Sequence, residues 1–477
     1  MSPVRRLAVI GAGIAGLAAG YELGRLSSEQ GEALDLTVFE AGPEPGGKIR
    51  SAAFSGTTVE LGAESLLARS PVILPLVEDL GLGTELVRPA TTAASLWTGR
   101  RLQPLPRSAV LGIPLHPWRP SALRVTGLRA GLRGGLEPWR RYPALEPDSS
   151  LASFLGPRLG RRLLGRTVEP LLGAVYAGPA GALDVGAVAP QLASAVAGGT
   201  SLLRGLRRSQ VSAAGGGATP FVSFRGGLSQ LVTALQRKLP AGALHLSRRV
   251  ASLSAGPGSL LRLHADREDP GFDGVVLAIP GAEAAGTVGE LAPELASLLH
   301  QLDYASVGTA TLAYRDGALS QELLGSGFLV AGSTRQTLTA ATFLDRKWPH
   351  LRQPGLTILR ASFGRLGEES SLVLDDASLV TSLHLELRRI LRLSQLPVEV
   401  RVQRWHGALP QYVAGTLAWR RAVDQAASRV PVPLVVTGSA VAGVGVAACL
   451  EGGVAAARQL WERTGPGAAE VGPTRAG

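Results

Sequence analysis

Residues 7–20 read LAVIGAGIAGLAAG, in which Gly11, Gly13 and Gly16 form the pattern G-x-G-x-x-G where an apolar run gives way to helical spacing. The first glycine permits a tight turn, the second lets the backbone approach a pyrophosphate, and the third allows a helix to pack closely on a strand. The N-terminus of the following helix then faces the negative phosphates. The pattern therefore predicts a dinucleotide-binding βαβ unit at the start of the chain.

The surrounding residues support this prediction. We expect a strand at residues 6–10, a helix at about 14–26 and a second strand at 34–39. The second strand ends at Glu40, and an acidic residue at about this distance beyond the glycines reaches a ribose hydroxyl. The glycines and the acid together favour a folded nucleotide-binding unit over another glycine-rich turn.

Two segments could be mistaken for targeting or membrane signals. Arg5 and Arg6, followed by apolar residues, resemble a secretory or twin-arginine signal, but the glycine offsets fit a folded unit better. The uncharged run at 431–450 approaches the length of a bilayer span. Because it opens with two prolines and contains three glycines, we interpret it as a strand, a glycine turn and the start of a helix.

Composition limits the chemistry that the chain can support. The 477 residues are enough for two or three domains, and Cys449 is the only cysteine. An intrachain disulfide and a cysteine-based metal site are therefore excluded, which is compatible with a reducing cytoplasm. The seven histidines lie too far apart in sequence for the short spacings of metal ligands, so we expect no metal.

Positive charge is concentrated in one segment. The chain carries a net charge of +11, and residues 100–166 contain thirteen arginines against three acids. Leucines with helical spacing alternate with these arginines at positions 123, 128, 132 and 136. We predict a helical insertion at 100–205 with a basic, partly apolar surface that could attract an anionic substrate or an anionic membrane. Ordinary helices with solvated arginine faces remain the alternative.

The rest of the chain alternates between helical and strand patterns. We expect helices at 71–82 and from 224–228 to Leu239, with a glycine break at Gly215–Gly217 before the second. Strand patterns follow: a β-rich stretch at 244–253, a buried strand at 275–280, and an antiparallel sheet that includes 309–314 and 356–363. Residues 431–457 return to a strand, a turn and a helix. The predicted fold class is α/β: a Rossmann-like, discontinuous dinucleotide-binding domain, a substrate domain with a mixed or antiparallel sheet, and a helical insertion. The predicted limits are 1–72, 220–285 and 403–465 for the dinucleotide-binding domain, 73–99 and 286–402 for the substrate domain, 100–205 for the insertion and 466–477 for a flexible tail.

Three further glycine-rich turns point to FAD. Residues 41–50, AGPEPGGKIR, place a glycine pair and Lys48 directly after the ribose acid, and residues 60–65, ELGAES, offer more backbone for close approach. Far away, residues 437–446, TGSAVAGVGV, end where a helix starts, so that free N–H groups can stabilise negative charge. A long cofactor that touches both ends of the chain fits FAD.

Together these residues resemble the FAD-dependent amine oxidase-like flavoproteins. Within that superfamily, EPLLGAVYAG at 169–178 and WHGALPQYVAG at 405–415 resemble signatures of the porphyrinogen oxidase family, and residues 346–350 and 445–452 also match. The resemblance runs from residue 5 to about 460 and is closest to the bacterial coproporphyrinogen III oxidases, relatives of protoporphyrinogen oxidase. Departures from the family pattern are Lys48 for a frequent arginine, Ala174 for glycine, Pro179 for aspartate, Thr416 for histidine, and Ala447 and Ala448 for Pro-Asp.

The resemblance implies a haem-biosynthetic enzyme. It would oxidise coproporphyrinogen III to coproporphyrin III in three rounds, each passing hydride to flavin N5 and using O2 to produce H2O2. Because such chemistry depends on the cofactor and on positioning, we name no catalytic side chain. Protoporphyrinogen IX oxidase, a flavin amine oxidase and a non-catalytic flavin or porphyrin carrier remain alternatives.

The residues that match the family's motifs give the expected sites. The resemblance implies FAD contacts from Gly11, Ala12, Gly13, Ile14, Ala15, Gly16, Glu40, Ala41, Lys48, Gly62, Ala63, Glu64, Ser65, Val250, Trp405, Val444, Gly445 and Val446. Candidate substrate residues are Ala174, Val175 and Tyr176, with Arg69 as a propionate partner, while His406 is expected to be structural. We expect a porphyrinogen and O2 as partners and no nucleic acid, in a cytoplasmic protein able to contact the inner face of the cell membrane; the oligomeric state stays open.

Overall fold

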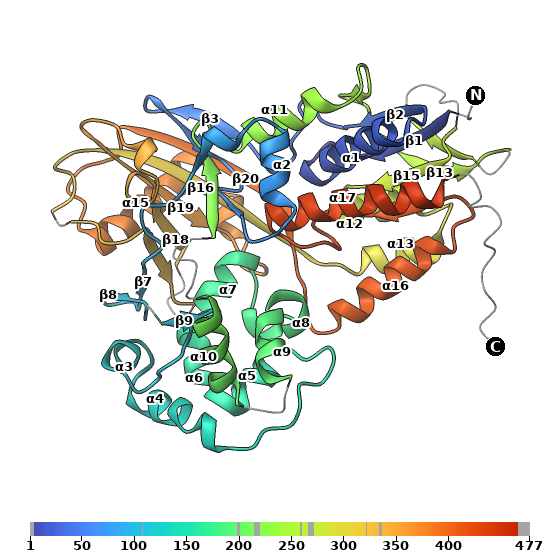
Figure 1. The fold of residues 1–477 in the computed structure, drawn as a ribbon. Coiled ribbons are helices and arrows are strands. Elements are labelled where there is room, and N and C mark those ends of the chain that lie inside the picture. The colour runs from blue at the N-terminus through green and yellow to red at the C-terminus, as the bar shows by residue number, and fades with distance from the viewer. Residues whose placement is uncertain are drawn as a thin grey trace.

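The computed structural model describes residues 4–106, 108–197, 201–213, 220–257, 260–265, 271–320, 322–332 and 336–465. Two predictions, the glycine break at Gly215–Gly217 and the tail at 466–477, lie outside these residues. Figure 1 shows a helix-covered sheet beside a second, longer sheet, with a group of helices below them.

The first sheet consists of five strands, all paired in parallel, in the order β12-β2-β1-β15-β21. These strands are β1 (Arg5–Ile10), β2 (Leu34–Phe39), β12 (Leu244–His245), β15 (Gly274–Leu277) and β21 (Leu434–Val436). These strands come from three separate stretches of the chain, 5–39, 244–277 and 434–436, as the predicted discontinuous FAD-binding fold requires. Strand β15 is buried throughout, because helices cover both faces of a parallel sheet.

Side chains alternate between the two faces of this sheet. Leu7 and Val9 pack in one core and Ala8 and Ile10 in another, as the two-residue period of a strand dictates. The first core also receives α1 (Ile14–Gln30), α2 (Ile73–Asp79), α11 (Ser229–Lys238) and α17 (Val446–Arg463); the second receives α12 (Gly281–Val288), α13 (Pro293–His300) and α16 (Thr416–Ser428). Helices α1 and α17 approach closely at Gly453, where a Cβ would stand 2.1 Å from the Ala15 carbonyl oxygen.

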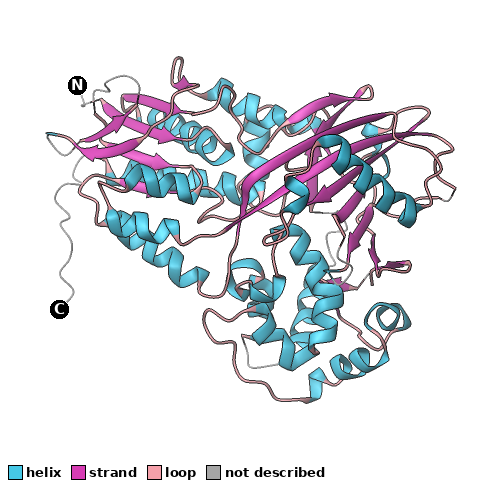
Figure 2. Ribbon diagram, turned by 180° about the vertical axis from the view of Figure 1, so that it is seen from behind, coloured by secondary structure: helices cyan, strands magenta, loops and turns pink. Residues whose placement is uncertain are grey.

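The second sheet has seven strands in the order β20-β16-β19-β18-β17-β7-β8. These are β7 (Ala94–Trp97), β8 (Leu102–Pro104), β16 (Tyr304–Arg315), β17 (Gly327–Val330), β18 (Leu338–Phe343), β19 (Leu356–Phe363) and β20 (Glu399–Pro410). Its pairs are antiparallel except for β17 with β7, so the predicted mixed sheet is confirmed. Figure 2 shows its long strands passing above the helical group, and α15 (Asp376–Leu391) packs on it through leucines.

The predicted insertion at 100–205 is helical only in its later part. Its first twenty residues form β8, which joins the seven-stranded sheet, and the short pair β9 (Ala109–Val110) and β10 (Ile113–Pro114). Prolines at 104, 106, 114 and 117 remove the N–H groups and the backbone freedom that a helix needs. The helical unit that follows comprises α3 (Pro120–Thr126), α4 (Leu128–Gly135), α5 (Leu151–Leu159), α6 (Arg161–Leu163), the π-helical turn Leu164–Val168, α7 (Glu169–Tyr176), α8 (Val185–Val188), α9 (Pro190–Val196) and α10 (Leu202–Ala213).

Several helices and strands pack differently from the predicted domain limits. Helix α2 packs in the core of the parallel sheet, although the predicted substrate domain begins at residue 73. Helix α13 packs on the same sheet, and β20 crosses the predicted limit at 402. The β-rich stretch at 244–253 is divided between β12 and the start of β13 (Ser252–Ala255). The domain limits themselves stay a prediction.

The remaining short elements connect these layers. They are β3 (Ser51–Phe54), β4 (Thr57–Glu60), β5 (Leu66–Leu67), β6 (Leu86–Val87), β11 (Phe221–Phe224), β14 (Leu261–His264) and α14 (Leu344–Lys347), together with short 3-10 turns. Within the described ranges, no helix is both long and apolar enough to cross a bilayer.

Candidate functional site

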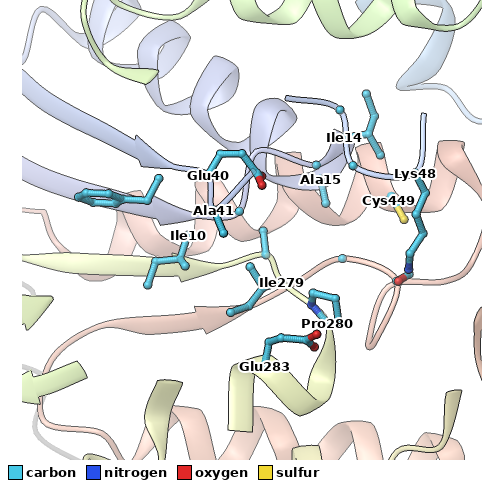
Figure 3. A pocket seen from close by; sticks show the side chains of 18 of the residues that line it. Ile10, Ile14, Ala15, Glu40, Ala41, Lys48, Ile279, Pro280, Glu283 and Cys449 are labelled. Carbon is cyan, nitrogen blue, oxygen red and sulfur yellow. The ribbon is translucent and has the colours of Figure 1, made fainter. Parts of the chain in front are cut away.

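A cavity of about 690 Å³ opens where the parallel strands end. This is the edge at which open α/β sheets bind ligands. Predicted cofactor residues that line it are Gly11, Gly13, Ile14, Ala15, Glu40, Ala41, Lys48, Ala63, Val250, Val444 and Val446. Figure 3 shows side chains from the start, the middle and the end of the chain around this cavity. The structure thus brings together the two distant glycine regions that the sequence linked to one cofactor.

The three glycines of the first turn have different environments. Gly11 has a φ of 99°, and a Cβ on it would stand 2.7 Å from the Ala278 carbonyl oxygen. A Cβ on Gly16 would lie 1.8 Å from the Gly11 carbonyl oxygen, so this residue permits the close helix–strand packing. A Cβ on Gly13 would meet nothing within 4 Å, because that position faces the cavity. The space needed by a pyrophosphate is therefore at Gly13.

Glu40 is held beside the glycine turn (Figure 3). Its carboxylate accepts hydrogen bonds of 2.8 Å from the backbone N–H groups of Ala12 and Gly42. These bonds fix the side chain at the cavity wall and leave lone pairs on both oxygens. The geometry suits an acceptor for ribose hydroxyls.

Lys48 and Cys449 lie on another wall of the cavity (Figure 3). The Lys48 Nζ donates to the Ala408 carbonyl oxygen at 2.5 Å, and burial lowers the pKa of this amine against the opposing effects of Cys449 and Glu283. The Cys449 thiol donates to the Gly443 carbonyl oxygen at 3.2 Å. Burial raises the pKa of Cys449 to about 11, partly opposed by Lys48, so the sulfur is a neutral thiol at pH 7.

The ELGAES turn is held from outside the cavity by the seven-stranded sheet. The Leu61 carbonyl oxygen accepts hydrogen bonds of 3.0 Å from Thr309 Oγ1 and Trp405 Nε1, and the Gly62 carbonyl oxygen accepts one from Arg360. A Cβ on Gly62 would stand 2.0 Å from the Lys48 carbonyl oxygen, so the turn lies directly on the Lys48 segment. Trp405 therefore positions this turn and is not among the residues that line the cavity.

Glu64 is directed into an ion network beside that turn. Its carboxylate accepts from Lys347 Nζ at 2.5 Å, from Trp348 Nε1 at 2.8 Å and from Arg360 at 3.4 Å. Burial by itself would raise its pKa, but Lys347 and Arg360 outweigh burial and hold the pKa at about 2. At neutral pH Glu64 is thus an ionised residue that links the ELGAES turn to α14 and β19.

Several other predicted residues also lie outside the cavity lining. These are Ala12, Gly16, Gly62, Ser65 and Gly445 for the cofactor and Arg69 for the substrate. Arg69 is exposed after β5, and it lines neither described cavity. Direct contact of these residues with a ligand stays a prediction.

The predicted substrate residues end helix α7. Ala174 and Val175 are exposed, whereas the Tyr176 ring is buried, with its centroid 6.0 Å from that of Tyr412. Gln411 Nε2 donates to the Tyr176 carbonyl oxygen at 2.7 Å, which ties EPLLGAVYAG to the PQY segment. Tyr176 is consequently a packed aromatic at this junction, and Val175 is the residue that offers free apolar surface.

Sequence reasoning missed a third wall of the cavity. Ile279, Pro280 and Glu283 line it from the end of β15 and the start of α12, and Arg248 and Arg249 line it after β12. The Arg248 Nε is buried and has no hydrogen-bond partner among the described residues. The sequence could have indicated this wall, because residues 275–280, VVLAIP, predict a buried strand. The carboxyl end of that strand must lie at the same edge of the parallel sheet as the glycine turn.

The residues that line the cavity fit FAD. The N-termini of α1 and α17 meet the cavity at Gly13 and Val446, where their free N–H groups favour negative charge. Open space at Gly13 and the Glu40 carboxylate suit a pyrophosphate and a ribose, and apolar lining suits a planar ring. Among the described residues, no group of three or more histidine, cysteine or acidic side chains could hold a metal ion.

Known proteins with these features support the same conclusion. The model of the flavin-containing amine oxidoreductase family matches residues 14–461. Coproporphyrinogen III oxidases of Bacillus subtilis and Mycobacterium leprae are 30% identical over 460 residues and 33% identical over 454 residues, covering 95% and 94% of this chain and 97% and 96% of the relatives. A crystal structure from Exiguobacterium sp. 255-15, provisionally named a protoporphyrinogen oxidase, has a TM-score of 0.84 at 29% identity and covers 96% of this chain and 98% of its own. The protein is an FAD-dependent oxidoreductase that belongs to the flavin-containing amine oxidoreductase family.

Proposed function

We propose that this protein oxidises coproporphyrinogen III to coproporphyrin III in haem biosynthesis. The observation that carries the proposal is the contact between the two porphyrinogen oxidase motifs and the flavin cavity. Gln411 bonds to Tyr176 of α7, and the neighbouring Tyr412 hydroxyl donates to the carbonyl oxygen of Ser439, which lines the cavity. The names of the relatives at 30% and 33% identity support the same substrate.

The proposed reaction removes six hydrogens from the macrocycle in three rounds. FAD supplies the acceptor for each hydride, and O2 takes the electrons away as H2O2, so three molecules of O2 are consumed for each porphyrin. The chain itself binds the cofactor at the glycine turn and Glu40, positions the ELGAES turn through Trp405 and Arg360, and excludes water with apolar walls.

A half-buried arginine beside the substrate motifs supports a carboxylate-bearing substrate. The Arg420 guanidinium carbon lies 4.4 Å from the centroid of the Tyr412 ring. Its Nε and one Nη are buried, and the described residues supply no hydrogen-bond partner for them. N–H groups that are buried without an acceptor are costly, and a propionate would satisfy these two with a bidentate pair. We therefore add Arg420 to Arg69 as a proposed propionate partner.

The experiment is anaerobic mixing of the FAD-loaded protein with coproporphyrinogen III or protoporphyrinogen IX, while flavin absorbance is followed. We expect faster flavin bleaching with coproporphyrinogen III, because it offers four carboxylates to the two arginines where protoporphyrinogen IX offers two. Faster bleaching by protoporphyrinogen IX would show that the dicarboxylate is the substrate. A porphyrinogen that binds without bleaching the flavin would favour a carrier, and bleaching by amines alone would favour an amine oxidase.

We also infer peripheral contact between the helical unit and an anionic membrane. Leu128, Leu132, Leu136 and Trp139 are exposed in this unit, beside several arginines. An apolar row with basic flanks is typical of helices that lie in the headgroup region of a bilayer.

A further inference from the structure

A second cavity, of about 670 Å³, lies between α4, α5 and α6. Figure 1 places α3 and α4 at the end of the helical unit away from α1 and α17. Four arginines line this cavity: Arg129 and Arg133 from α4, and Arg161 and Arg162 from α6. Small or apolar residues complete its lining: Ala130, Ala152, Ser153, Gly156, Pro157, Leu159 and Gly160. We name this cavity the arginine pocket.

The charges of the arginine pocket are not neutralised within the described chain. No ion pair joins any of its four arginines to a carboxylate of the described residues. Arg133 is fixed in place, since it donates to the Pro157 carbonyl oxygen at 3.3 Å and its stem packs on Gly160. Four like charges around one concavity repel one another and concentrate counter-anions. The positive electrostatic potential of the arginine pocket therefore favours the binding of an anion.

The shape and lining of the pocket favour a compact oxyanion. No residue lines both this pocket and the flavin cavity among the described residues, so its ligand does not meet the cofactor. None of its described lining residues is aromatic, which leaves a flat macrocycle without a stacking surface. Guanidinium groups bind phosphate oxygens in paired hydrogen bonds, and small neighbours such as Gly156 leave room for the group.

The surface next to the pocket indicates what carries the oxyanion. On α4, Leu128, Leu132 and Leu136 form a row at four-residue spacing and are 64%, 56% and 48% exposed. Arg129 and Arg133 each follow one of these leucines, so a basic row that faces the pocket runs beside an apolar row that faces solvent. An oxyanion attached to hydrocarbon chains satisfies both rows at once.

We propose that the arginine pocket binds the phosphate group of an anionic phospholipid. The leucine row then meets the hydrocarbon boundary of the same bilayer, and the pocket fixes the orientation of the helical unit on the surface. This inference deepens the membrane contact proposed above and does not depend on which substrate is oxidised.

The test uses the FAD-loaded full chain and two matched double variants. Arg161→Gln with Arg162→Gln removes two charges from the pocket. Arg140→Gln with Arg141→Gln removes two charges of the same unit that are exposed, as the pocket arginines are, but lie outside the pocket lining. Because these two arginines follow the exposed Trp139, this control tests charge near the proposed membrane contact without the pocket. Co-sedimentation with phosphatidylcholine vesicles containing phosphatidylglycerol, and with phosphatidylcholine alone, gives the affinities. Flavin absorbance of the pelleted protein confirms that each variant is folded.

We expect binding to the anionic vesicles only, weakened about 30-fold by the pocket variant and less than about 3-fold by the control variant. Leu132→Gln should weaken vesicle binding but leave unchanged the rise in melting temperature that inorganic phosphate produces in the wild type. Equal losses in both double variants would show unspecific charge attraction and overturn the proposal, as would stabilisation by phosphate without vesicle binding. Porphyrinogen-driven flavin bleaching without vesicles should be unaltered in both double variants, so failure of the lipid site and failure of the proposed reaction are separate results.

Discussion

The buried carboxyl of Glu60 offers a sharp test of the electrostatics beside the flavin cavity. Glu60 ends β4 and is the first residue of the ELGAES turn, which Trp405 and Arg360 hold. Its oxygens accept from the Leu228 backbone N–H at 2.6 Å and from Ser51 Oγ at 2.9 Å. Burial raises its pKa from 4.5 to about 7, and these hydrogen bonds offset only part of that effect.

The sign of the pH dependence follows from the raised pKa. Between pH 4.5 and pH 7 the folded protein keeps a proton on Glu60 that the unfolded chain has already lost. The stability from this protonated carboxyl is therefore fully present below pH 4.5 and is lost as pH rises through 7. A difference of 2.5 pKa units corresponds to about 3 kcal/mol of unfolding free energy at pH 8, because one unit is worth about 1.4 kcal/mol.

The perturbation is Glu60→Gln, which resembles the protonated carboxyl: its amide oxygen can accept from the Leu228 N–H, and its NH2 group can donate to Ser51 Oγ, which reverses the direction of that bond. Urea unfolding of the FAD-loaded protein, followed by tryptophan fluorescence, should show the variant more stable by about 3 kcal/mol at pH 8 and by less than about 1 kcal/mol at pH 5. The control is Glu369→Gln, a change of the same charge at an exposed position. An equal effect in the control, or a variant without added stability at pH 8, would refute the reasoning.

Three further substitutions test how the cofactor is held. Gly13→Val should fold normally yet lose more than about tenfold in FAD affinity, measured by fluorescence of released flavin, because its side chain would enter the cavity; full FAD content would contradict this assignment. Gly16→Ala should instead lower stability by about 1–3 kcal/mol in urea unfolding, because its Cβ would meet the Gly11 carbonyl; an unchanged midpoint would contradict the packing role. Trp405→Phe should cost about 1 kcal/mol of FAD binding in titrations through the lost bond to Leu61, and wild-type affinity would show that this bond does not position the turn.

Part of the fold and of the site was predictable because it depends on short stretches of sequence. Apolar runs with two-residue or helical periods predicted β19 at its observed bounds and β1 within one residue. The helix at 71–82 was too long at both ends, since only Ile73–Asp79 is helical. The predicted helical insertion at 100–205 begins instead with short strands, because prolines at 104, 106, 114 and 117 are incompatible with a continuous helix and the leucines with helical spacing start only at position 123.

Side-chain direction was not predictable in the same way. Glu64 and Trp405 stand in cofactor motifs, yet Glu64 turns to Lys347 and Arg360, and Trp405 bonds to a carbonyl behind the cavity wall. Arg248 and Arg249 belong to none of the motifs, yet both line the cavity. Their roles depend on which partners the fold brings within about 3 Å, and those partners lie far away in the chain.

The sequence by itself determined a nucleotide-binding turn, an FAD-sized set of glycine turns and a family. Each of these rests on backbone conformations that consecutive residues dictate, such as the positive φ of Gly11. Only the tertiary structure decided which residues line the cavity and how the seven-stranded sheet holds the ELGAES turn by hydrogen bonds. It also decided that four arginines line a pocket away from the flavin cavity. The physical reason is that burial and electrostatic fields depend on three-dimensional proximity, which a linear pattern encodes only through the complete fold.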